Sequence, residues 1–297
     1  MKLLILDAGH CLSLALARVA NRRSDTELTI DAGCELTPGQ LEALAPDALV
    51  IPPLARPISA EPAAVTAHAQ SVETCMEACV ASRVPLVWCV SDQLYEDGFD
   101  SPIDEHVIPR PRDESLRRLV ATGDRIRAEC PRHLIVRVGP MFALEGGHAW
   151  LNELIDTLLA GGELRGETDV IFCPTSVDAV AMALVGMLQQ QRCGAEAWGS
   201  YHLAGTEPVS AYTFVSTVRT QLATRLEGRG DHRQLGTLKA LSHHHGQPLR
   251  RVLNCRRVLE VFGVHQKPWR LEMGLMLDAW CQANEVVPPG PASEVTP

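Results

Sequence analysis

The first residues whose types and spacing bear on chemistry form a turn near the amino terminus. The chain opens with the apolar run MKLLIL, passes through Asp7, Ala8 and Gly9, and enters an apolar stretch that ends near Ala20. A strand, a tight turn and a helix in this order are typical of nucleotide-binding α/β domains, in which the turn and the helix N-terminus hold a pyrophosphate. The sequence therefore predicts a phosphate-binding frame at its start.

The glycines that such a turn normally carries are largely replaced. A missing side chain lets the backbone approach a phosphate, at G-x-x-G-x-x-G spacing, and the matching positions here are Asp7, His10 and Ser13. Gly9 and His10 remain candidate cofactor contacts, because an imidazolium at His10 would replace a lost amide donor. The alternative for His10 is a helix-terminal residue that faces solvent. A carboxylate at Asp7 would repel a pyrophosphate.

Asp31 is a third candidate for cofactor contact. Doubly wound folds place a discriminating residue for the adenosine ribose just after the second strand, which we expect over Glu27–Ile30. The alternative is that Asp31 is only a turn residue beside Gly33.

A second group of polar residues follows the continuous apolar run Val84–Val90, a pattern typical of a strand covered on both faces. Ser91 comes directly after this run, and Tyr95 follows in the same polar segment. The carboxyl ends of buried parallel strands are where doubly wound folds place their chemistry. Ser91 and Tyr95 are therefore candidate catalytic residues. The alternatives are a strand-end cap for Ser91 and a packed ring for Tyr95.

Composition limits the class of protein. Hydrophobic residues make up 46% of the 297 residues and the formal net charge is −9, so we expect a folded globular chain that binds neither nucleic acid nor a membrane. No apolar run reaches the length of a transmembrane span, and no signal peptide is recognised. Ten cysteines without a CxxC pair indicate reduced thiols and a cytoplasmic protein.

No metal site is expected. Cys75 and Cys79 are one helical turn apart, but further ligands are missing and small apolar residues on one helix face are the simpler interpretation. His243–His245 fall in a polar stretch, where solvated side chains are expected.

The order of apolar runs and turn residues predicts the fold. Expected strands alternate with expected helices up to Tyr201–Gly205, and the remainder is expected to be helical with a polar excursion at Gly228–Gln247. This pattern predicts an α/β protein, a Rossmann-like doubly wound parallel sheet with a small C-terminal α/β lobe. We expect the dinucleotide-type domain over residues 1–165, the interwoven substrate-type lobe over 166–286, and a disordered tail over 287–297.

Several segments, in order along nearly the whole chain, match a known pattern. Pro46–Ile51 matches P-D-x-V-I-N, and Ser91-Asp92 with Asp97-Gly98 matches the end of S-T-D-Y-V-F-D-G. Further matching segments are Pro131–Arg137, Cys173–Ser176, Gly199–Gly205, Leu253-Asn254, Phe262–Val264 and Pro268–Arg270. With these segments the chain resembles the dTDP-4-dehydrorhamnose reductase family, the sugar-nucleotide branch of the extended short-chain dehydrogenases.

The resemblance implies a site for hydride transfer from NADPH or NADH to a 4-keto sugar nucleotide. In that family a Ser or Thr, matched here by Ser91, works with the Tyr and Lys of a Y-x-x-x-K helix. The helix corresponds to Glu114–Arg127, which contains neither tyrosine nor lysine and places Leu116 and Val120 at the two positions. The arginines of this segment, such as Arg118, are expected on a solvated face.

These replacements predict a catalytically degenerate family member that binds a sugar nucleotide or acts as a regulatory partner subunit. The regulatory subunit of methionine adenosyltransferase resembles the family and is a precedent. Two alternatives stay open: an active NAD(P)H-dependent reductase or epimerase with an atypical site at Ser91 and Tyr95, and a structural subunit of a homo-oligomer without a small ligand. If a cofactor binds, the resemblance implies NADP or NAD.

The resemblance also implies where an anionic substrate would bind. The second half of the chain matches the family better than the cofactor half does. Four residues are candidate substrate contacts on this basis, namely Arg137, Thr175, Tyr201 and Arg250. A retained anionic ligand is expected near Arg137, Thr175 or the pair Arg250-Arg251.

Overall fold

A six-stranded parallel sheet forms the centre of the molecule, which is described by a computed structural model over residues 1–31, 36–54, 56–147, 150–242 and 248–284. The strand order is β10-β5-β4-β3-β1-β2, and all neighbours are parallel. The strands are β1 (Lys2–Leu6), β2 (Glu27–Asp31), β3 (Ala48–Ile51), β4 (Leu86–Ser91), β5 (His133–Val138) and β10 (Gly199–Leu203). The chain order reverses between β1 and β3, which is where doubly wound folds open a crevice at the carboxyl ends of the strands.

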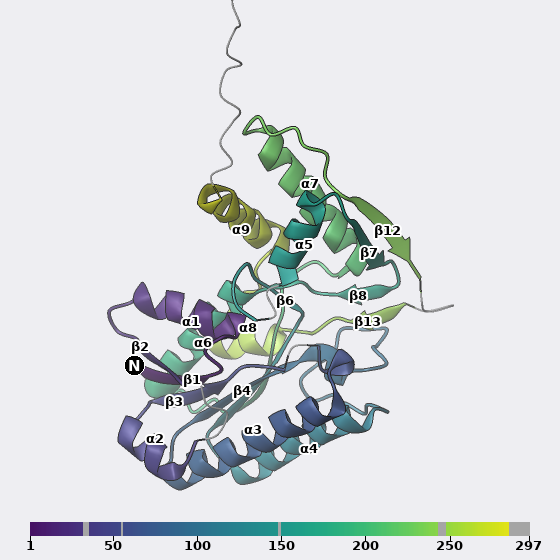
Figure 1. Ribbon diagram of the computed structural model, residues 1–297. Helices are drawn as coiled ribbons and strands as arrows, with labels where there is room; N and C mark the ends of the chain where they lie inside the picture. Colours follow the sequence, from purple (N-terminus) through teal and green to yellow (C-terminus); the bar gives the residue numbers. More distant parts are fainter. Residues whose placement is uncertain (32–35, 55, 148–149, 243–247, 285–297) are drawn as a thin grey trace, which may run out of the picture.

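Helices cover both faces of this sheet (Figure 1). On one face lie α1 (Cys11–Asn21) and α6 (Val177–Arg192), and on the other α2 (Pro38–Leu44), α3 (Pro62–Ser82) and α4 (Glu114–Glu129). Alternate residues of β1 supply the two cores, since Leu3 and Ile5 face α1 while Leu4 and Leu6 face the α3 side. Burial on both faces explains why the strands are continuous apolar runs.

The second part of the molecule is a lobe beyond the carboxyl edge of the sheet. It contains the helices α5 (Trp150–Leu159), α7 (Ala211–Glu227) and α9 (Trp269–Ala283) and the strands β7 (Glu163–Glu167), β8 (Val170–Phe172), β11 (Val209–Ser210), β12 (Thr237–Leu241) and β13 (Leu249–Arg251). The remaining short elements of the described residues are β6 (Met141–Phe142), β9 (Thr175–Ser176), α8 (Arg256–Phe262) and the 3₁₀ helices η1 (Pro57–Ser59) and η2 (Asp92–Leu94). Phe214 of α7 is fully buried among other rings, with Trp150 at 4.7 Å and Trp269 at 5.2 Å between ring centroids.

The predicted fold class is confirmed, and one expectation about the second half is wrong. The stretch after β10 was expected to be helical around a polar excursion, yet β12 lies inside that excursion and β13 follows it. β12 pairs in parallel with β7, which is distant in sequence, and its side chains are mostly exposed. An apolar pattern was therefore not required to form it. The expectations for His243–His245 and for residues 287–297 lie outside the described residues.

Two arginines of α4, Arg118 and Arg125, also differ from expectation, whereas Arg117 is exposed as expected. Arg118 and Arg125 donate to the same Glu73 carboxylate oxygen of α3, at 2.8 and 2.9 Å, and Thr122 donates to the other oxygen at 2.7 Å. Glu73 is buried. These residues join α3 to α4 and do not form a freely solvated face.

None of the described helices is long and apolar enough to cross a membrane.

Candidate functional site

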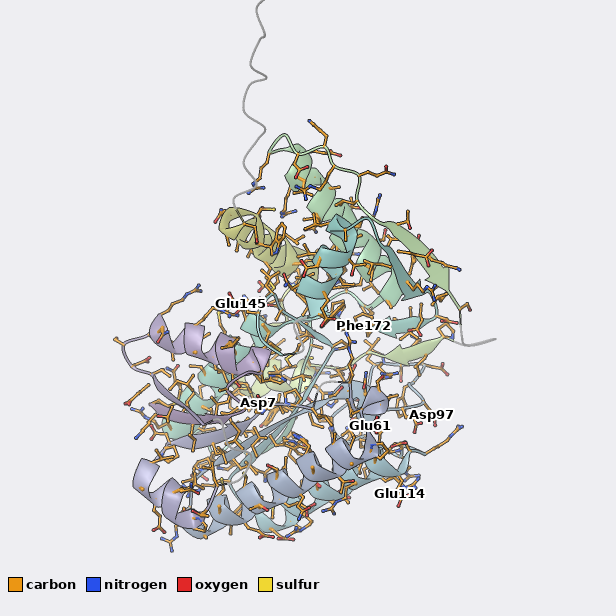
Figure 2. All side chains as sticks on the ribbon, in the orientation of Figure 1. Asp7, Glu61, Asp97, Glu114, Glu145 and Phe172 are labelled. Atoms are coloured by element: carbon orange, nitrogen blue, oxygen red, sulfur yellow. The ribbon has the colours of Figure 1, made fainter. Side chains whose placement is uncertain are left out.

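A cavity of about 440 Å³ lies between the carboxyl edge of the sheet and the lobe. Its sheet side is formed by residues that follow β1, β3, β4 and β5, and its lobe side by α5, β7, β8, α7 and β13. Figure 2 shows Asp7 on the sheet side and Phe172 on the lobe side. The cavity therefore lies at the carboxyl ends of the parallel strands, where doubly wound folds bind their ligands.

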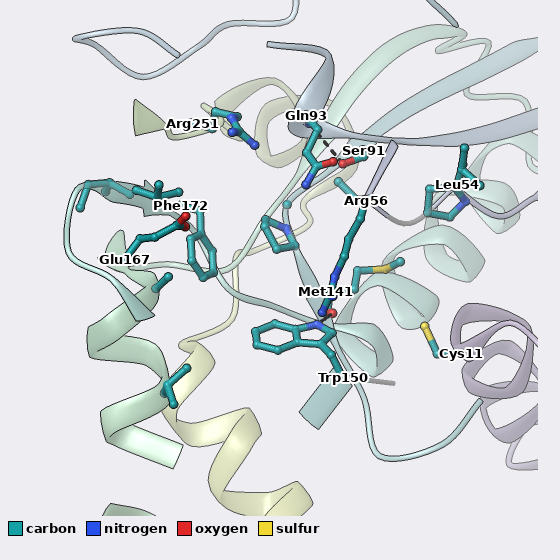
Figure 3. A pocket seen from close by; sticks show the side chains of 18 of the residues that line it. Cys11, Leu54, Arg56, Ser91, Gln93, Met141, Trp150, Glu167, Phe172 and Arg251 are labelled. Carbon is teal, nitrogen blue, oxygen red and sulfur yellow. Dashed lines mark hydrogen bonds between the residues drawn. The ribbon is translucent and has the colours of Figure 1, made fainter. Parts of the chain in front are cut away.

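Ser91 and Gln93 stand at the end of β4 on the sheet side of the cavity (Figure 3). The Ser91 hydroxyl accepts a hydrogen bond from the Gln93 backbone N–H at 3.2 Å and lies 3.4 Å from Asp92 Oδ1, to which it donates. Gln93 Oε1 accepts from the Ile58 backbone N–H at 3.2 Å. This bond fixes the amide orientation, so that the Gln93 side chain has its NH₂ group left to donate.

Asp92 lies behind these residues and is 1% exposed. Burial raises the pKa of Asp92 to about 6, and the nearby positive charge of Arg251 opposes that rise. Its Oδ2 atom has no hydrogen-bond partner among the described residues. A carboxyl group that titrates near neutral pH therefore stands directly behind Ser91.

Three arginines and one glutamate line the cavity, namely Arg56, Arg165, Arg251 and Glu167. Arg251 is half-buried, and its Nε has no hydrogen-bond partner among the described residues. Arg165 Nε donates to Glu163 at 3.1 Å. The side chain of Arg56 crosses the cavity toward Trp150 (Figure 3). The lining is thus cationic on balance, and it favours an anion.

The lobe side supplies an apolar floor. Trp150, Leu154, Phe172 and Val215 line it, and Met141 closes one side. The Trp150 ring is held in place because its Nε1–H donates to the Met141 carbonyl. Apolar area of this kind beside arginines suits a ligand that has both a flat or apolar part and a negative charge.

At the turn after β1, the amides that would face a phosphate are already bonded within the chain. The N–H of His10 donates to the Asp7 carbonyl at 3.1 Å, and the N–H of Cys11 donates to the Gly147 carbonyl at 3.2 Å. The N–H of Leu12 donates to His10 Nδ1 at 3.0 Å. Because Nδ1 accepts, the His10 ring is not an imidazolium in this arrangement. The expected role of His10 as a cation is therefore not supported by its geometry. The alternative, a solvent-facing residue at the helix end, is wrong in its second part, because His10 caps α1 but is only 2% exposed.

The segment Glu145–Gly147, which we call the glycine strap, lies against this turn. The N–H of Gly147 donates to the Gly9 carbonyl at 2.6 Å. Gly146 has φ +89°, and a Cβ there would stand 2.8 Å from Cys11 Cα. Glu145 forms an ion pair with Arg18 of α1 at 3.0 Å. Only glycine allows so close an approach, so the sequence of the strap is matched to the turn.

Two further groups stand beside the turn. Asp7 is exposed and has φ +58°. Burial lowers the pKa of His68 to about 4, while the negative charge of Asp7 opposes that change. A neutral imidazole and a carboxylate therefore occupy the end of β1 that a pyrophosphate would approach.

Helix α4 presents no proton donor at the two positions where the resemblance implies tyrosine and lysine. Leu116 is fully buried in the core between the sheet and α3, and Val120 packs against the same core. These side chains act in packing.

The remaining predicted catalytic and cofactor residues do not line the cavity. The Tyr95 ring is 1% exposed and its hydroxyl donates to the Val107 carbonyl at 3.1 Å. Burial raises the pKa of Tyr95 to about 12. Asp31 ends β2, and its side chain lies outside the described part of the structure. Of the predicted residues, Ser91 and His10 are the ones that line the cavity.

The predicted substrate contacts are mainly internal. Arg137 is buried and donates to the Glu105 carbonyl at 3.1 Å, with His202 Nε2 at 3.2 Å. The Tyr201 hydroxyl donates to the Ala197 carbonyl at 2.9 Å, and the Thr175 hydroxyl donates to the Cys173 carbonyl at 3.0 Å. All three support the framework of the cavity from outside its lining.

Arg250 also lies outside the cavity lining, whereas the next residue, Arg251, is part of it. Neighbouring residues of a strand point to opposite faces, so the register of β13 decides which of the two arginines enters the cavity.

Sequence reasoning also missed Arg56, Arg165 and Gln93. The i, i+2 spacing of Arg165 and Glu167 was an available signal, because it places both side chains on one face of a strand.

The described residues contain no group of three or more histidine, cysteine, aspartate or glutamate side chains that could hold a metal ion. Cys75 and Cys79 are buried in the core between the sheet and α3, as small apolar residues are.

Comparison with known protein families decides the relationship. Residues 59–281 match the RmlD substrate binding domain family. The chain belongs to this family. A dTDP-4-dehydrorhamnose reductase from Sinorhizobium fredii is 22% identical over 289 residues, which is 89% of this chain and 95% of the relative. The predicted dTDP-4-dehydrorhamnose reductase-like family is therefore confirmed.

Solved structures share the fold of this family member. A dTDP-4-dehydrorhamnose reductase from Clostridium acetobutylicum has a TM-score of 0.76 at 15% identity, over 94% of this chain and 99% of the other. The Bacillus anthracis enzyme, solved in complex with NADP, gives the same TM-score, identity and coverage. MoeE5, solved in complex with UDP-glucuronic acid and NAD, has a TM-score of 0.72 at 17% identity, over 95% of this chain and all of the other (100%).

Proposed function

We propose that this family member binds a sugar nucleotide in the cavity and does not carry out the hydride transfer of its reductase relatives. The observation that carries the proposal is the packing of Leu116 and Val120 of α4 against the core. By the resemblance, these two positions hold the tyrosine and the lysine of the Y-x-x-x-K motif in the reductases. Loss of a general acid costs about two to four orders of magnitude in rate. Binding does not depend on these two groups.

The cavity supports the binding part of the proposal. A sugar nucleotide has a flat base, a sugar and a diphosphate, and the lining offers an apolar floor near Trp150 together with Arg56, Arg165 and Arg251. Guanidinium groups suit phosphate oxygens because they donate several hydrogen bonds in a planar arrangement. Structural neighbours solved with UDP-glucose and UDP-glucuronic acid point to the same class of ligand.

The turn after β1 does not fit a dinucleotide pyrophosphate. To bind there, the phosphate would have to separate Cys11 from the Gly147 carbonyl and approach the carboxylate of Asp7. Both steps oppose binding. If a dinucleotide does bind, the neighbours solved with NADP or NAD indicate its class.

One observation favours the alternative of an active enzyme with an atypical site. Ser91 lines the cavity with Asp92 3.4 Å behind it, and burial raises the pKa of Asp92 to about 6. A group with such a pKa is able to supply a proton near neutral pH.

A turnover assay separates the two functions. The purified protein is mixed with NADPH or NADH and a dTDP-4-keto-6-deoxy sugar, and cofactor absorbance is followed, while calorimetry measures the binding of dTDP-glucose and UDP-glucose. The proposal predicts saturable binding of a nucleotide sugar and no oxidation of cofactor above the rate without protein. Oxidation that depends on the keto sugar and is lost in Ser91→Ala would establish the alternative.

A further inference from the structure

We infer that Asp92 is a positioning residue for the bound sugar, because its protonation decides whether the Ser91 hydroxyl donates or accepts a hydrogen bond in the cavity. Ser91 lines the cavity at the end of β4 (Figure 3), and Asp92 is buried directly behind it. The inference rests on the proposed function, since the sugar must bind in this cavity. It adds which polar group of the sugar the site prefers, a carbonyl or a hydroxyl, and how pH changes that preference.

The Ser91 hydroxyl has one proton to donate and two lone pairs that accept. One lone pair accepts from the Gln93 backbone N–H at 3.2 Å, an arrangement fixed by the 3₁₀ helix η2, which Ser91 caps. Asp92 Oδ1 lies 3.4 Å from the same hydroxyl oxygen. The bond between Ser91 and Asp92 therefore uses either the proton or the second lone pair of Ser91, and the other of the two is left for a ligand.

The two protonation states of Asp92 present different groups to the ligand. An ionised carboxylate only accepts, so Ser91 then donates its proton to Oδ1 and offers a lone pair to the cavity. A carboxyl group protonated on Oδ1 donates to Ser91, which uses the second lone pair and turns the Ser91 proton toward the ligand. A sugar carbonyl has no proton and bonds only to the second state, whereas a sugar hydroxyl donates or accepts and bonds to both.

The surroundings of Asp92 favour a proton on Oδ1. The side chain is 1% exposed, and its Oδ2 atom has no hydrogen-bond partner among the described residues. A proton on Oδ2 would be a buried donor without an acceptor, whereas a proton on Oδ1 is within reach of Ser91. Arg251 Nε also lacks a partner in the described part of the chain, so this atom does not bond to the carboxylate, and Arg251 acts on Asp92 through its charge.

Asp92 is the group of this region that changes its charge near neutral pH. Burial raises the pKa of Asp92 to about 6, and the positive charge of Arg251 of β13 opposes that rise. The charge of Asp92 also acts on Tyr95, after η2, and on Cys173, after β8, and burial raises the pKa of each of these two groups to about 12. Helix α4 packs against η2 through the apolar core that contains Leu94. Tyr95 and Cys173 therefore stay neutral while Asp92 titrates between about pH 5 and about pH 7.

A matched pair of probes tests this role of Asp92. dTDP-4-keto-6-deoxyglucose and dTDP-6-deoxyglucose differ only in a carbonyl or a hydroxyl at one sugar carbon, and calorimetry without cofactor measures both dissociation constants at about pH 5 and about pH 7.5. The ratio of the two constants cancels titrations that act on the shared nucleotide part. The preference for the keto sugar is expected to be about 5- to 30-fold greater at the lower pH. The lower limit is one hydrogen bond, and the upper limit is set by the protonated fraction of about 3% that remains at the higher pH.

Asp92→Asn and Ser91→Ala are each expected to give the same ratio at both pH values, because the first removes the titrating group and the second removes the hydroxyl. The matched control is Asp97→Asn, which is expected to keep the full pH dependence. Asp97 is exposed, pairs with Arg112 at 3.4 Å and lies outside the cavity lining. Thermal unfolding at both pH values verifies folding. Ser91 is only half-buried, so Ser91→Ala carries the test if Asp92→Asn does not fold.

Each contrary outcome has a distinct meaning. A ratio that does not change with pH in the wild-type protein would overturn the positioning role of Asp92 and leave the proposed function in place. Persistence of the pH dependence in Asp92→Asn or in Ser91→Ala would also overturn it, because the effect would then come from another group or would not pass through the Ser91 hydroxyl. Failure of both nucleotide sugars to bind at either pH would overturn the proposed function and the positioning role together.

Discussion

The turn after β1 and the arginine-lined part of the cavity differ in whether their hydrogen-bond donors already have partners within the protein. At the turn, the backbone N–H groups of His10, Cys11 and Leu12 are all bonded within the chain. In the cavity, the donors are side chains, and neither the guanidinium of Arg56 nor the Nε of Arg251 has a hydrogen-bond partner among the described residues. The comparison teaches that anion binding depends on donors that folding leaves unsatisfied, and that a phosphate-binding frame does not by itself provide them.

The expected hydrogen-bond energies also favour anion binding in the cavity over binding at the turn. A phosphate at the turn would gain hydrogen bonds only by breaking existing ones, each with a net value of about 1 kcal/mol, and would meet the charge of Asp7. An anion beside the guanidinium group of Arg56 displaces no protein acceptor, because no described residue forms a hydrogen bond or ion pair with that group, and hydrogen bonds to charged groups contribute about 1.5–3 kcal/mol. Ligand binding is therefore expected at the cavity and not at the turn.

The largest effect is expected from breaking the glycine strap. Gly146→Ala would place a Cβ 2.8 Å from Cys11 Cα at φ +89°, so we expect the free energy of unfolding to fall by about 3 kcal/mol, from overpacking together with left-handed strain. Urea denaturation measures it. Gly161→Ala is the matched control, because Gly161 has φ +73° with nothing within 4 Å. It isolates the strain, at about 1 kcal/mol. Equal losses in the two variants would show that the strap does not press on the turn.

Asp92→Asn tests whether ionisation of the buried Asp92 carboxyl group, behind Ser91, destabilises the fold. The pKa of Asp92 is raised to about 6 from 3.8, so the folded protein binds this proton more tightly than the unfolded chain does. Stability therefore falls as pH rises through this window. The variant is expected to be more stable than wild type by up to about 3 kcal/mol at about pH 7.5, with no such gain below about pH 4.

Urea unfolding at the two pH values measures this difference. Asp97→Asn, at an exposed position, is the control and is expected to change stability little at either pH. A gain for Asp92→Asn that does not depend on pH would contradict the account of its burial.

Glu73 tests whether α4 serves packing in this protein. Burial tends to raise the pKa of Glu73, but Thr122, Arg125 and Arg118 outweigh that effect and hold it below its usual value. The ionised carboxylate thus stabilises the fold above the ordinary glutamate pKa, and the contribution is lost as pH falls through the lowered value. Glu73→Gln is expected to cost about 2 kcal/mol at neutral pH and progressively less in acid.

The control for Glu73→Gln is Glu77→Gln. Glu77 binds the same Arg125 at 3.1 Å but is largely exposed, so a loss of less than about 0.5 kcal/mol is expected. Thermal or urea unfolding at neutral and acid pH compares the two. Similar small losses in both variants would mean that the buried network does not hold α4 on α3.

The smallest effect is expected at Arg56, where stability and binding should change in opposite directions. Arg56→Gly relieves left-handed strain at the expense of backbone entropy, so a gain of about 0.5 kcal/mol in the free energy of unfolding is expected, together with weaker binding of UDP-glucose because a lining guanidinium is lost. Arg83→Gly is the control, because Arg83 also has a left-handed φ of 57° but lies outside the cavity lining. Urea unfolding and calorimetry compare the two variants, and the affinity for UDP-glucose should be unchanged in Arg83→Gly. An equal loss of affinity in both variants would show that the effect does not come from the cavity.

The sequence was sufficient for the frame because the frame depends on local patterns. Apolar runs such as Val84–Val90 predicted buried parallel strands, and polar Ser91 was correctly expected at the carboxyl edge. β12 was missed because an exposed strand needs no apolar pattern and is formed by pairing with distant β7. The strap was missed for a similar reason, since Gly146 reads as an ordinary loop glycine until the fold brings it against Cys11.

The cavity residues were harder to predict because they depend on register. The pair Arg250-Arg251 was expected near an anion and Arg250 was chosen as the contact, whereas Arg251 lines the cavity, a shift of one residue in a short strand. Arg137, Thr175 and Tyr201 match the family pattern, yet their polar atoms bond within the framework. Side chains retained for packing and side chains retained for binding give the same pattern in a single sequence.

The most direct test of the contrast is a ¹⁵N NMR titration of one sample with NADPH and then with UDP-glucose. The account predicts that the amide signals of Cys11 and Leu12 stay unchanged with NADPH, and that the Nε–H signals of Arg56 and Arg251 shift saturably with the sugar nucleotide. Saturable shifts of the Cys11 and Leu12 amides with NADPH, and none at the two arginines with the sugar nucleotide, would contradict it.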